Sequence, residues 1–358
     1  MTGAQVNSGA NSGVKSGADP GRRWLARPGF IGGLVVLLCL LLLLAVGVGS
    51  SWLSPDRVLR ALVGAGERMD QVIVQTLRLP RALLAAQAGV CLALAGALLQ
   101  RATRNPLASP SVVGVVDGAA VGVVLFLWLF SNEANALTVS IHFQPLAAAA
   151  GAVVFAAIVG LLTWLDDGGP MRLIIYGVAI AALASAIVTL LIILGPVFRA
   201  SQALIWLAGS VHQAHWDDVV SLAILLTMSL PFLALMPRVM DQFLLDDDTA
   251  ATTGLAVGAT RALLLLIAVY LTASAVSFVG GIAFVGLIAP HVARLILGQN
   301  AAPYLIGSAL IGAIIVLASD IVARLILAPL ELPTGAVTAL IGAPYFLYIL
   351  IQRGRSHA

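Results

Sequence analysis

The feature that most constrains this chain is a series of apolar runs, each about 20 residues long and so long enough to cross a bilayer as an α-helix. In hydrocarbon the backbone must satisfy its own hydrogen bonds, so only helices or closed barrels can span a membrane. The runs are continuously apolar and lack the in–out alternation of barrel strands. They therefore predict an all-α, polytopic membrane protein.

Composition supports this fold class and narrows the function. Hydrophobic residues make up 60% of the 358 residues and charged residues only 10%, against about 25% charged in soluble domains. A formal net charge of +3 is too small to suggest a nucleic-acid partner. Cys39 and Cys91 both lie inside apolar runs, which favours packing over a disulfide framework.

The runs predict about ten helices in one membrane domain over residues 30–358. Residues 1–29 are rich in Gly and Ser and carry four basic side chains, which is typical of a disordered tail. Hydropathy alone leaves 280–297 ambiguous, and counting it places both termini on the same side. The expected helices cover residues 30–49, 82–100, 112–130, 145–165, 172–194, 218–236, 261–279, 284–297, 304–327 and 334–351.

Loop charge predicts the orientation of these helices. With a cytoplasmic N-terminus, twelve of the 19 Lys and Arg residues face the cytoplasm, as the positive-inside rule requires. We therefore expect both termini in the cytoplasm. Five of the seven exceptions fall in the loop 52–81, which suggests an acidic partner outside.

Small residues at helical spacing predict close helix packing. Gly118 and Gly122 form a GxxxG pair. The segment 281–294 carries two more glycines before Pro290, and we expect its helix to stop at that proline. The candidate packing glycines are Gly89, Gly96, Gly118, Gly122, Gly281 and Gly286.

Five segments in a fixed order carry a family resemblance. They are Arg78–Arg81 with the glycines that follow it, Arg104–Pro110 with Asp117, Leu245–Gly254, Gly281–Arg294, and Asp320–Arg324 followed by Glu331–Gly335 and Gly342–Phe346. Together they resemble the permease subunits of bacterial ABC importers for iron–siderophore complexes, haem and vitamin B12. Two departures are Asp117, where the family often has Ser or Asn, and Leu245-Asp-Asp, where it usually has Leu-Gly-Glu.

The resemblance implies a non-catalytic permease in the bacterial cytoplasmic membrane. Its partners would be a second permease subunit, two ATP-binding subunits, a substrate-binding protein and membrane lipid. The cargo favoured is a ferric siderophore, with haem or vitamin B12 as alternatives. This chain itself would bind no cofactor, because ATP and Mg belong to the ATPase subunits. No phosphate-binding loop or HExxH motif occurs in the sequence.

Three arginines are candidates for docking the substrate-binding protein. Arg78 and Arg81 flank a Leu-Pro step, so we expect an extended or turning chain that displays both at the membrane surface. Arginine forms bidentate pairs with carboxylates, and the resemblance assigns these two, with Arg324, to docking. Anchoring to lipid phosphates is the alternative. Asp320 and Arg324 are four apart on an expected helix and should pair.

The polar segment 240–258 is the candidate ATPase-coupling segment. Asp247 or Asp248 can cap a short helix, and Gly254 can end it in the left-handed conformation. We expect two short helices joined by an acidic corner, which the resemblance assigns to the ATPase groove; a solvated loop is the alternative. The coupling candidates are Leu245, Asp246, Asp247, Asp248, Ala250 and Gly254.

The last candidate is a cytoplasmic gate at Asn105, Pro106 and Leu107. Pro106 and Pro110 prevent a continuous helix here, and the resemblance places the narrow end of the pathway at this point. A simple proline turn is the alternative. An intramembrane carboxylate such as Asp117 is by default functional, but its glycine-rich surroundings favour a structural role.

Two other readings of the chain are weaker. His212 and His215 with nearby aspartates superficially suggest a metal site, but helix capping fits them better, and we expect no metal. An ion-coupled secondary transporter would show charge pairs at mid-membrane, and it leaves the segment 240–258 unexplained.

Overall fold

The computed structural model describes residues 28–49, 52–132, 136–166, 169–195, 197–327 and 330–355. Within these ranges the chain is helical, with no strand beyond one isolated bridge between Ser131 and Leu137. Seven described helices are long and apolar enough to cross a membrane, and three shorter apolar helices accompany them. The all-α membrane fold is confirmed. Most of the expected tail lies outside the described residues.

The helices match the expected ranges closely. The long and medium helices are α2 (Pro28–Gly47), α5 (Leu79–Ala102), α6 (Val115–Leu129), α7 (Gln144–Leu165), α8 (Pro170–Leu194), α10 (Trp216–Gln242), α12 (Val257–Val279), α13 (Val285–Leu297), α14 (Ala301–Ile326) and α15 (Thr334–Arg355). Short helical elements connect them: α3 (Pro55–Leu62), α4 (Arg68–Gln71), the π-helix η1 (Val72–Arg78), the 3-10 turns η2 (Pro110–Val113) and η3 (Ile141–Phe143), α9 (Val197–Ala208) and α11 (Asp247–Thr252). The sequence interpretation did not anticipate α9.

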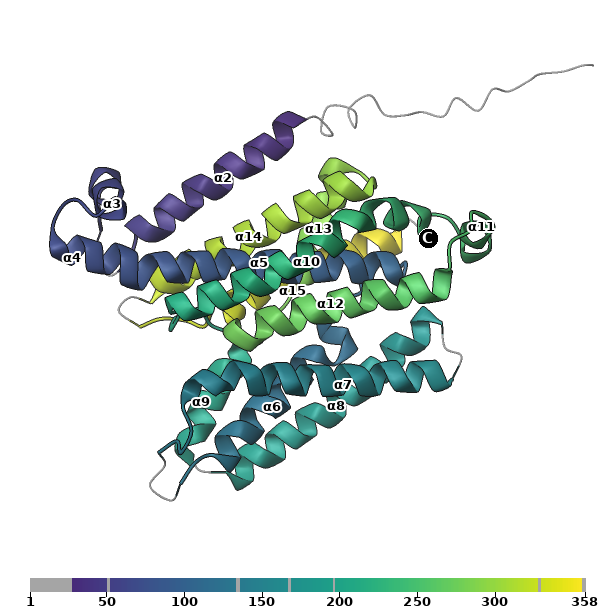
Figure 1. Ribbon diagram of the computed structural model, residues 1–358, viewed down its shortest axis with the longest axis horizontal. Coiled ribbons are helices and arrows are strands. Elements are labelled where there is room, and N and C mark those ends of the chain that lie inside the picture. Colours follow the sequence, from purple (N-terminus) through teal and green to yellow (C-terminus); the bar gives the residue numbers. More distant parts are fainter. Residues whose placement is uncertain are drawn as a thin grey trace, which may run out of the picture.

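The helices form two groups (Figure 1). One group holds α6, α7, α8 and α9. The other surrounds α5, which packs against α12, α13 and α14 and is buried along most of its length. The bundle has two ends that matter below: the α3 end, which carries α3 and α4, and the α11 end, on the opposite side.

Glycines set the closest helix contacts in both groups. A Cβ on Gly96 would overlap the carbonyl oxygen of Gly286, and one on Gly89 would overlap that of Gly312. These contacts bring α5 against α13 and α14 at backbone distance. Gly118 and Gly122 face α7 in the same way, and Gly281 lies against the carbonyl of Leu207.

Two expectations about prolines are wrong. The chain at Arg78–Arg81 is helical, and Pro80 is the second residue of α5. The π-helical η1 precedes it, so α4, η1 and α5 run on as one helix. Pro290 likewise does not end its helix: it lies inside α13, five residues after the helix begins.

Candidate functional site

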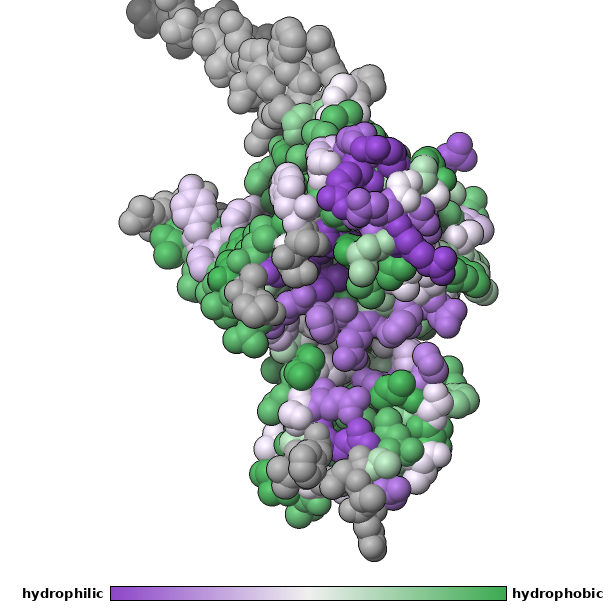
Figure 2. All heavy atoms as spheres, turned by 90° about the vertical axis from the view of Figure 1, so that its left-hand side faces the viewer, coloured by the Kyte–Doolittle hydropathy of each residue, from purple (hydrophilic) through white to green (hydrophobic). Residues whose placement is uncertain are grey.

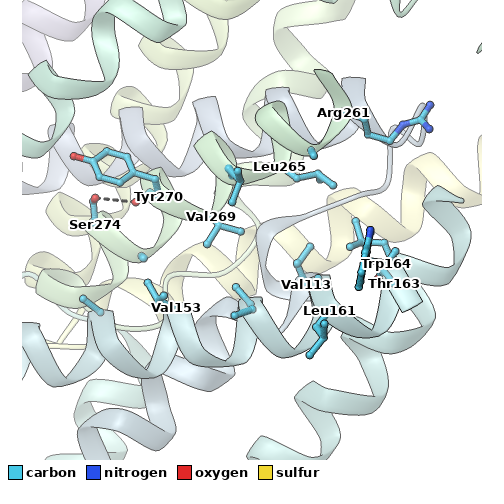
Figure 3. Close-up of a pocket in the computed structure, with 18 of the residues that line it drawn as sticks. Val113, Val153, Leu161, Thr163, Trp164, Arg261, Leu265, Val269, Tyr270 and Ser274 are labelled. Atoms are coloured by element: carbon cyan, nitrogen blue, oxygen red, sulfur yellow. Dashed lines mark hydrogen bonds between the residues drawn. The ribbon is translucent and has the colours of Figure 1, made fainter. Parts of the chain in front are cut away.

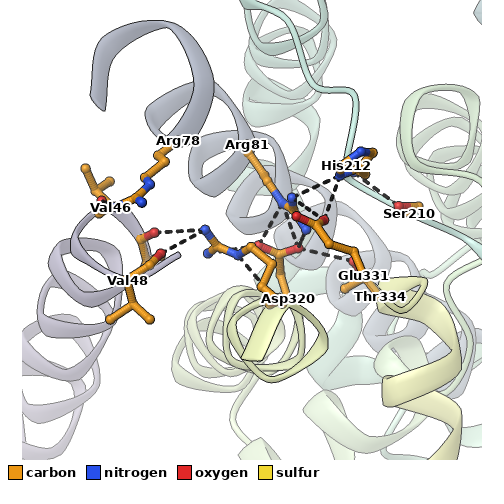
Figure 4. A network of polar contacts seen from close by, with 11 residues as sticks. Val46, Val48, Arg78, Arg81, Ser210, His212, Asp320, Glu331 and Thr334 are labelled. Carbon is orange, nitrogen blue, oxygen red and sulfur yellow. Dashed lines mark hydrogen bonds and ion pairs between the residues drawn. The ribbon is translucent and has the colours of Figure 1, made fainter. Parts of the chain in front are cut away.

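A buried charge network joins four elements at the α3 end. Asp320 of α14 accepts two hydrogen bonds from Arg81, from Nη2 at 2.8 Å and from Nε at 3.0 Å. The same guanidinium donates from Nη1 to Glu331 at 2.7 Å. His212 Nδ1 lies 2.6 Å from Glu331, and Thr334 donates to Asp320 at 3.3 Å (Figure 4). Asp320 is fully buried, and a buried carboxylate needs hydrogen-bonded cationic partners such as these.

Arg78 and Arg324 tie the end of α2 to this network. Arg78 Nη1 donates to the carbonyls of Val46 and Gly47, and Arg324 Nη1 donates to those of Ala45 and Val48. The last carbonyls of a helix have no partner within it and carry partial negative charge. Two guanidiniums therefore cap α2, which has few other buried contacts. Arg324 also pairs with Asp320 at 3.2 Å, as expected from their spacing.

The expected surface display of Arg78 and Arg81 is wrong. Arg78, Arg81 and Arg324 are only 7%, 6% and 8% exposed in the single chain. All three donate hydrogen bonds to groups of their own chain, and Arg78 and Arg81 lie on helical backbone rather than on a turn. Sequence reasoning found the Asp320–Arg324 pair from its spacing but missed Arg81–Asp320, whose partners are 239 residues apart.

Glu331 gives the network a pH dependence. Burial works against its ionisation, but hydrogen bonds and charge from Arg81 and His212 outweigh this, and its pKa is lowered. A lowered folded-state pKa stabilises the fold above the unfolded value, about 4.3, and this stabilisation disappears as the pH falls through the folded value. We expect Glu331→Gln to lower the melting temperature at neutral pH and to lose that difference in acid. A gap that stays constant from pH 7 to pH 3 would contradict this.

Exposed charges at the α3 end are also paired within the chain. Arg57 binds Asp70 in a bidentate pair at 2.7 and 2.8 Å, and Arg60 pairs with Asp56 one turn away on α3. The loop 52–81 thus supplies carboxylates for two of its own basic residues. Hydrophilic residues gather on this end of the bundle, with hydrophobic residues around them (Figure 2).

The coupling segment contains one short helix, α11, where two were expected. Its N-cap is Asp246, whose carboxylate accepts from the backbone N–H of Thr249 at 2.7 Å; the expected caps Asp247 and Asp248 lie inside the helix. Hydrogen bonds from the side chain and the backbone N–H of Thr249 lower the pKa of Asp246. Gly254 follows the helix with a φ of +86°, the left-handed conformation expected. Ala250 is buried, and Leu245 is exposed.

Asp247 lies between two arginines at the α11 end. Arg261 of α12 reaches both of its oxygens at 2.9 Å, and Arg104 reaches one of them at 2.7 Å. Arg104 also donates to the carbonyl of Phe243 at 3.1 Å. Arg104 has a positive φ of 50°, uncommon for a side chain of this size. Nothing in the sequence pattern indicated that Asp247 links these segments.

The candidate gate directly follows Arg104. The side chain of Asn105 accepts from the backbone N–H of Leu107 at 2.9 Å, closing a turn around Pro106. All three residues are partly exposed. The predicted gate and the predicted coupling segment are therefore neighbours, joined through the Arg104 side chain.

The remaining candidate residues lie outside the charge networks at the α3 end and the α11 end. Asp117 is in the first turn of α6, just after Gly114. His215 is the N-cap of α10, and its backbone N–H donates to Asp218 at 3.0 Å in a capping box. Among the described residues, no group of three or more His, Cys, Asp or Glu could hold a metal ion.

Comparisons with known proteins agree with this architecture. The FecCD transport family matches residues 37–352. The chain is 43% identical over 324 residues, 90% of its own length and 94% of the relative's, to the Bacillus subtilis protein named "Probable siderophore transport system permease protein YfhA". It is 42% identical over 285 residues, 79% and 74% of the two lengths, to the cobalamin import system permease protein BtuC of Halobacterium salinarum.

A solved structure shows the same fold. It is an inward-facing transporter assigned to the metal-chelate ABC type, with a TM-score of 0.80, 30% identity, and coverage of 91% of this chain and all of that one. The fold and the sequence matches define a multi-pass, non-catalytic permease subunit of an ABC transport system. The chain belongs to the FecCD transport family, which confirms the resemblance found in the sequence.

Proposed function

We propose that this chain forms the transmembrane pathway of an ATP-driven importer for ferric siderophores in the bacterial cytoplasmic membrane. Two ATPase subunits, a second permease subunit and a substrate-binding protein would complete the complex. The siderophore named for the Bacillus subtilis relative supports this cargo. The cobalamin named for the Halobacterium relative supports vitamin B12 as the alternative.

The observation that carries the mechanism is the link between the coupling segment and the gate. A movement of α11 displaces Asp247, and Asp247 holds Arg104 and Arg261 directly. Arg104 begins the turn that contains Asn105, Pro106 and Leu107. An ATPase that docks on α11 would therefore move the gate through two side chains in direct contact, the carboxylate of Asp247 and the guanidinium of Arg104.

The α3 end is the proposed docking surface for the binding protein. The positive-inside bias of the loops supports an orientation with this end outside and the α11 end in the cytoplasm. Arg78, Arg81 and Arg324 would hold the shape of this surface from beneath, while the exposed Arg60 and Arg68 offer charge to an acidic partner. Charge reversal at Arg60 and Arg68 should weaken binding-protein affinity, and unchanged affinity would exclude this surface.

Uptake by whole cells tests the proposal. Cells lacking this chain should lose uptake of labelled ferric siderophore and regain it with the gene restored. Labelled corrinoid and haem, measured in parallel, identify the cargo. A partner ATPase that cannot hydrolyse ATP should abolish uptake, whereas an ion-coupled transporter would continue to work. Uptake that survives the inactive ATPase would overturn the importer proposal.

A substitution at Leu107 tests the gate. Leu107→Ala removes apolar bulk from the proposed narrow end of the pathway, so we expect faster leak of trapped substrate from vesicles that contain the ATP-free complex. Leu295→Ala on α13, at the same end, 60% exposed and outside the turn, is the matched control and should leave leak unchanged. Equal leak in wild type and Leu107→Ala would support a simple proline turn.

A further inference from the structure

A groove of about 1000 Å³ runs between α7 and α12 (Figure 3). These helices face one another across the two groups of the fold. Its wall on α7 extends from Pro145 to Trp164, which corresponds to about 29 Å of helix. A bilayer's hydrocarbon core is about 30 Å thick. Both helices are long and apolar enough to cross a membrane, so the groove runs across most of the thickness of the hydrocarbon core.

The walls of the groove suit hydrocarbon. The hydroxyl groups that line it already donate to backbone carbonyls of their own helices: Thr163 to Val159 at 2.7 Å, Ser274 to Tyr270 at 2.8 Å and Ser277 to Ala273 at 2.7 Å. A polar ligand would lose its hydration here and find these protons already used. An apolar chain has no hydrogen bonds to water to lose when it enters the groove.

The end of the groove at Arg261 carries guanidinium groups. Arg261 lines this end and shares Asp247 with Arg104, while Asp246 also acts on Arg104. A guanidinium has five N–H donors in a fixed fork that matches a phosphate, so Arg261 can contact a lipid phosphate although the charges around it roughly balance. Trp164 lies at the same end of α7 and is 75% exposed. Tryptophan favours the membrane–water interface, where lipid phosphates lie.

We propose that this groove binds a phospholipid, with an acyl chain between α7 and α12 and the phosphate at the Arg261 end. The edge of the groove favours a lipid rather than water as the occupant, because the apolar side chains of Leu146, Leu161 and Leu266 are 68%, 54% and 65% exposed there. A bound acyl chain fills the space that the side chains leave between the two helix groups and restores contacts that a void would lack.

Photolabelling with a lipid probe tests the proposal. The purified chain is reconstituted in phosphatidylethanolamine vesicles with increasing fractions of phosphatidylglycerol that carries a diazirine on its acyl chain. Adducts on the groove residues Leu265 and Val269 should saturate at low probe fraction. Adducts on Leu235 of α10, which is 70% exposed, should rise in proportion to the probe. Proportional labelling at all three residues would overturn the proposal.

Two glycines give a matched pair of variants. Gly160 lines the groove, and a Cβ there meets nothing within 4 Å; Gly32 on α2 is equally open but lies away from it. Gly160→Phe should reduce groove adducts severalfold and Gly32→Phe should not. Unchanged groove labelling in Gly160→Phe, or crosslinking of a second copy through Gly160→Cys, would contradict a lipid occupant. If Gly160→Phe fails to fold, the wild-type saturation curve decides.

Discussion

Asp320→Asn is expected to destabilise the fold strongly, so that little folded protein is recovered. Asp320 is fully buried and pairs with both Arg81 and Arg324, which are themselves almost fully buried. An amide in its place leaves two guanidiniums in a low-dielectric site with only the partly exposed Glu331 beside them. Breaking a buried ion pair from one side costs about 3–5 kcal/mol. We expect a large fall in the melting temperature of the detergent-purified chain and in its yield.

A surface aspartate provides the control for this prediction. Asp56 pairs with Arg60 one turn away, and the side chains are 69% and 57% exposed. Such pairs contribute about 0–1 kcal/mol, so Asp56→Asn should leave the melting temperature almost unchanged. In the double variant Arg81→Gln/Asp320→Asn, part of the loss should return, because one orphaned cation is gone. A melting temperature for Asp320→Asn equal to that of Asp56→Asn would show that the network does not hold the fold.

The helices were predictable from the sequence because a membrane-spanning helix can be recognised from its own residues. A run of about 20 apolar residues can do little else in a bilayer, so each expected range overlaps an observed helix. Among the long helices, the expected ends failed at two prolines. Pro80 in the first turn of α5 and Pro290 inside α13 each looked like a helix end, and neither is one.

The partners of the charged residues were far harder to predict. The pair Asp320 and Arg324 follows from a spacing of four residues, but Arg81 finds Asp320 only after α5 and α14 have packed. The same is true of Asp247, whose two arginines come from the end of α5 and the start of α12. Local pattern identified which residues carry charge, while tertiary packing decided which charges meet.

The two ends of the bundle use these charges differently. At the α3 end, Arg78, Arg81 and Arg324 are buried and bind helix carbonyls and carboxylates of their own chain. At the α11 end, Asp247 and Arg104 are 46% and 32% exposed, so their pairing is weaker and can change. If an ATPase acts on the α11 end, as proposed, these more exposed contacts beside the proposed gate are the ones that it would change.

Asp247→Asn should therefore separate ATP hydrolysis from transport. The variant keeps the shape of α11 but loses the charge that holds Arg104 and Arg261. If the coupling between ATPase and gate passes through this carboxylate, substrate transported per ATP hydrolysed should fall about tenfold, within the usual range of coupling energies. Asp248→Asn, at the next position and exposed, is the matched control and should transport normally. Equal transport per ATP in both variants would place the coupling elsewhere. Loss of ATPase activity in Asp247→Asn alone would instead mean that this residue supports docking, which crosslinking from Leu245 would detect.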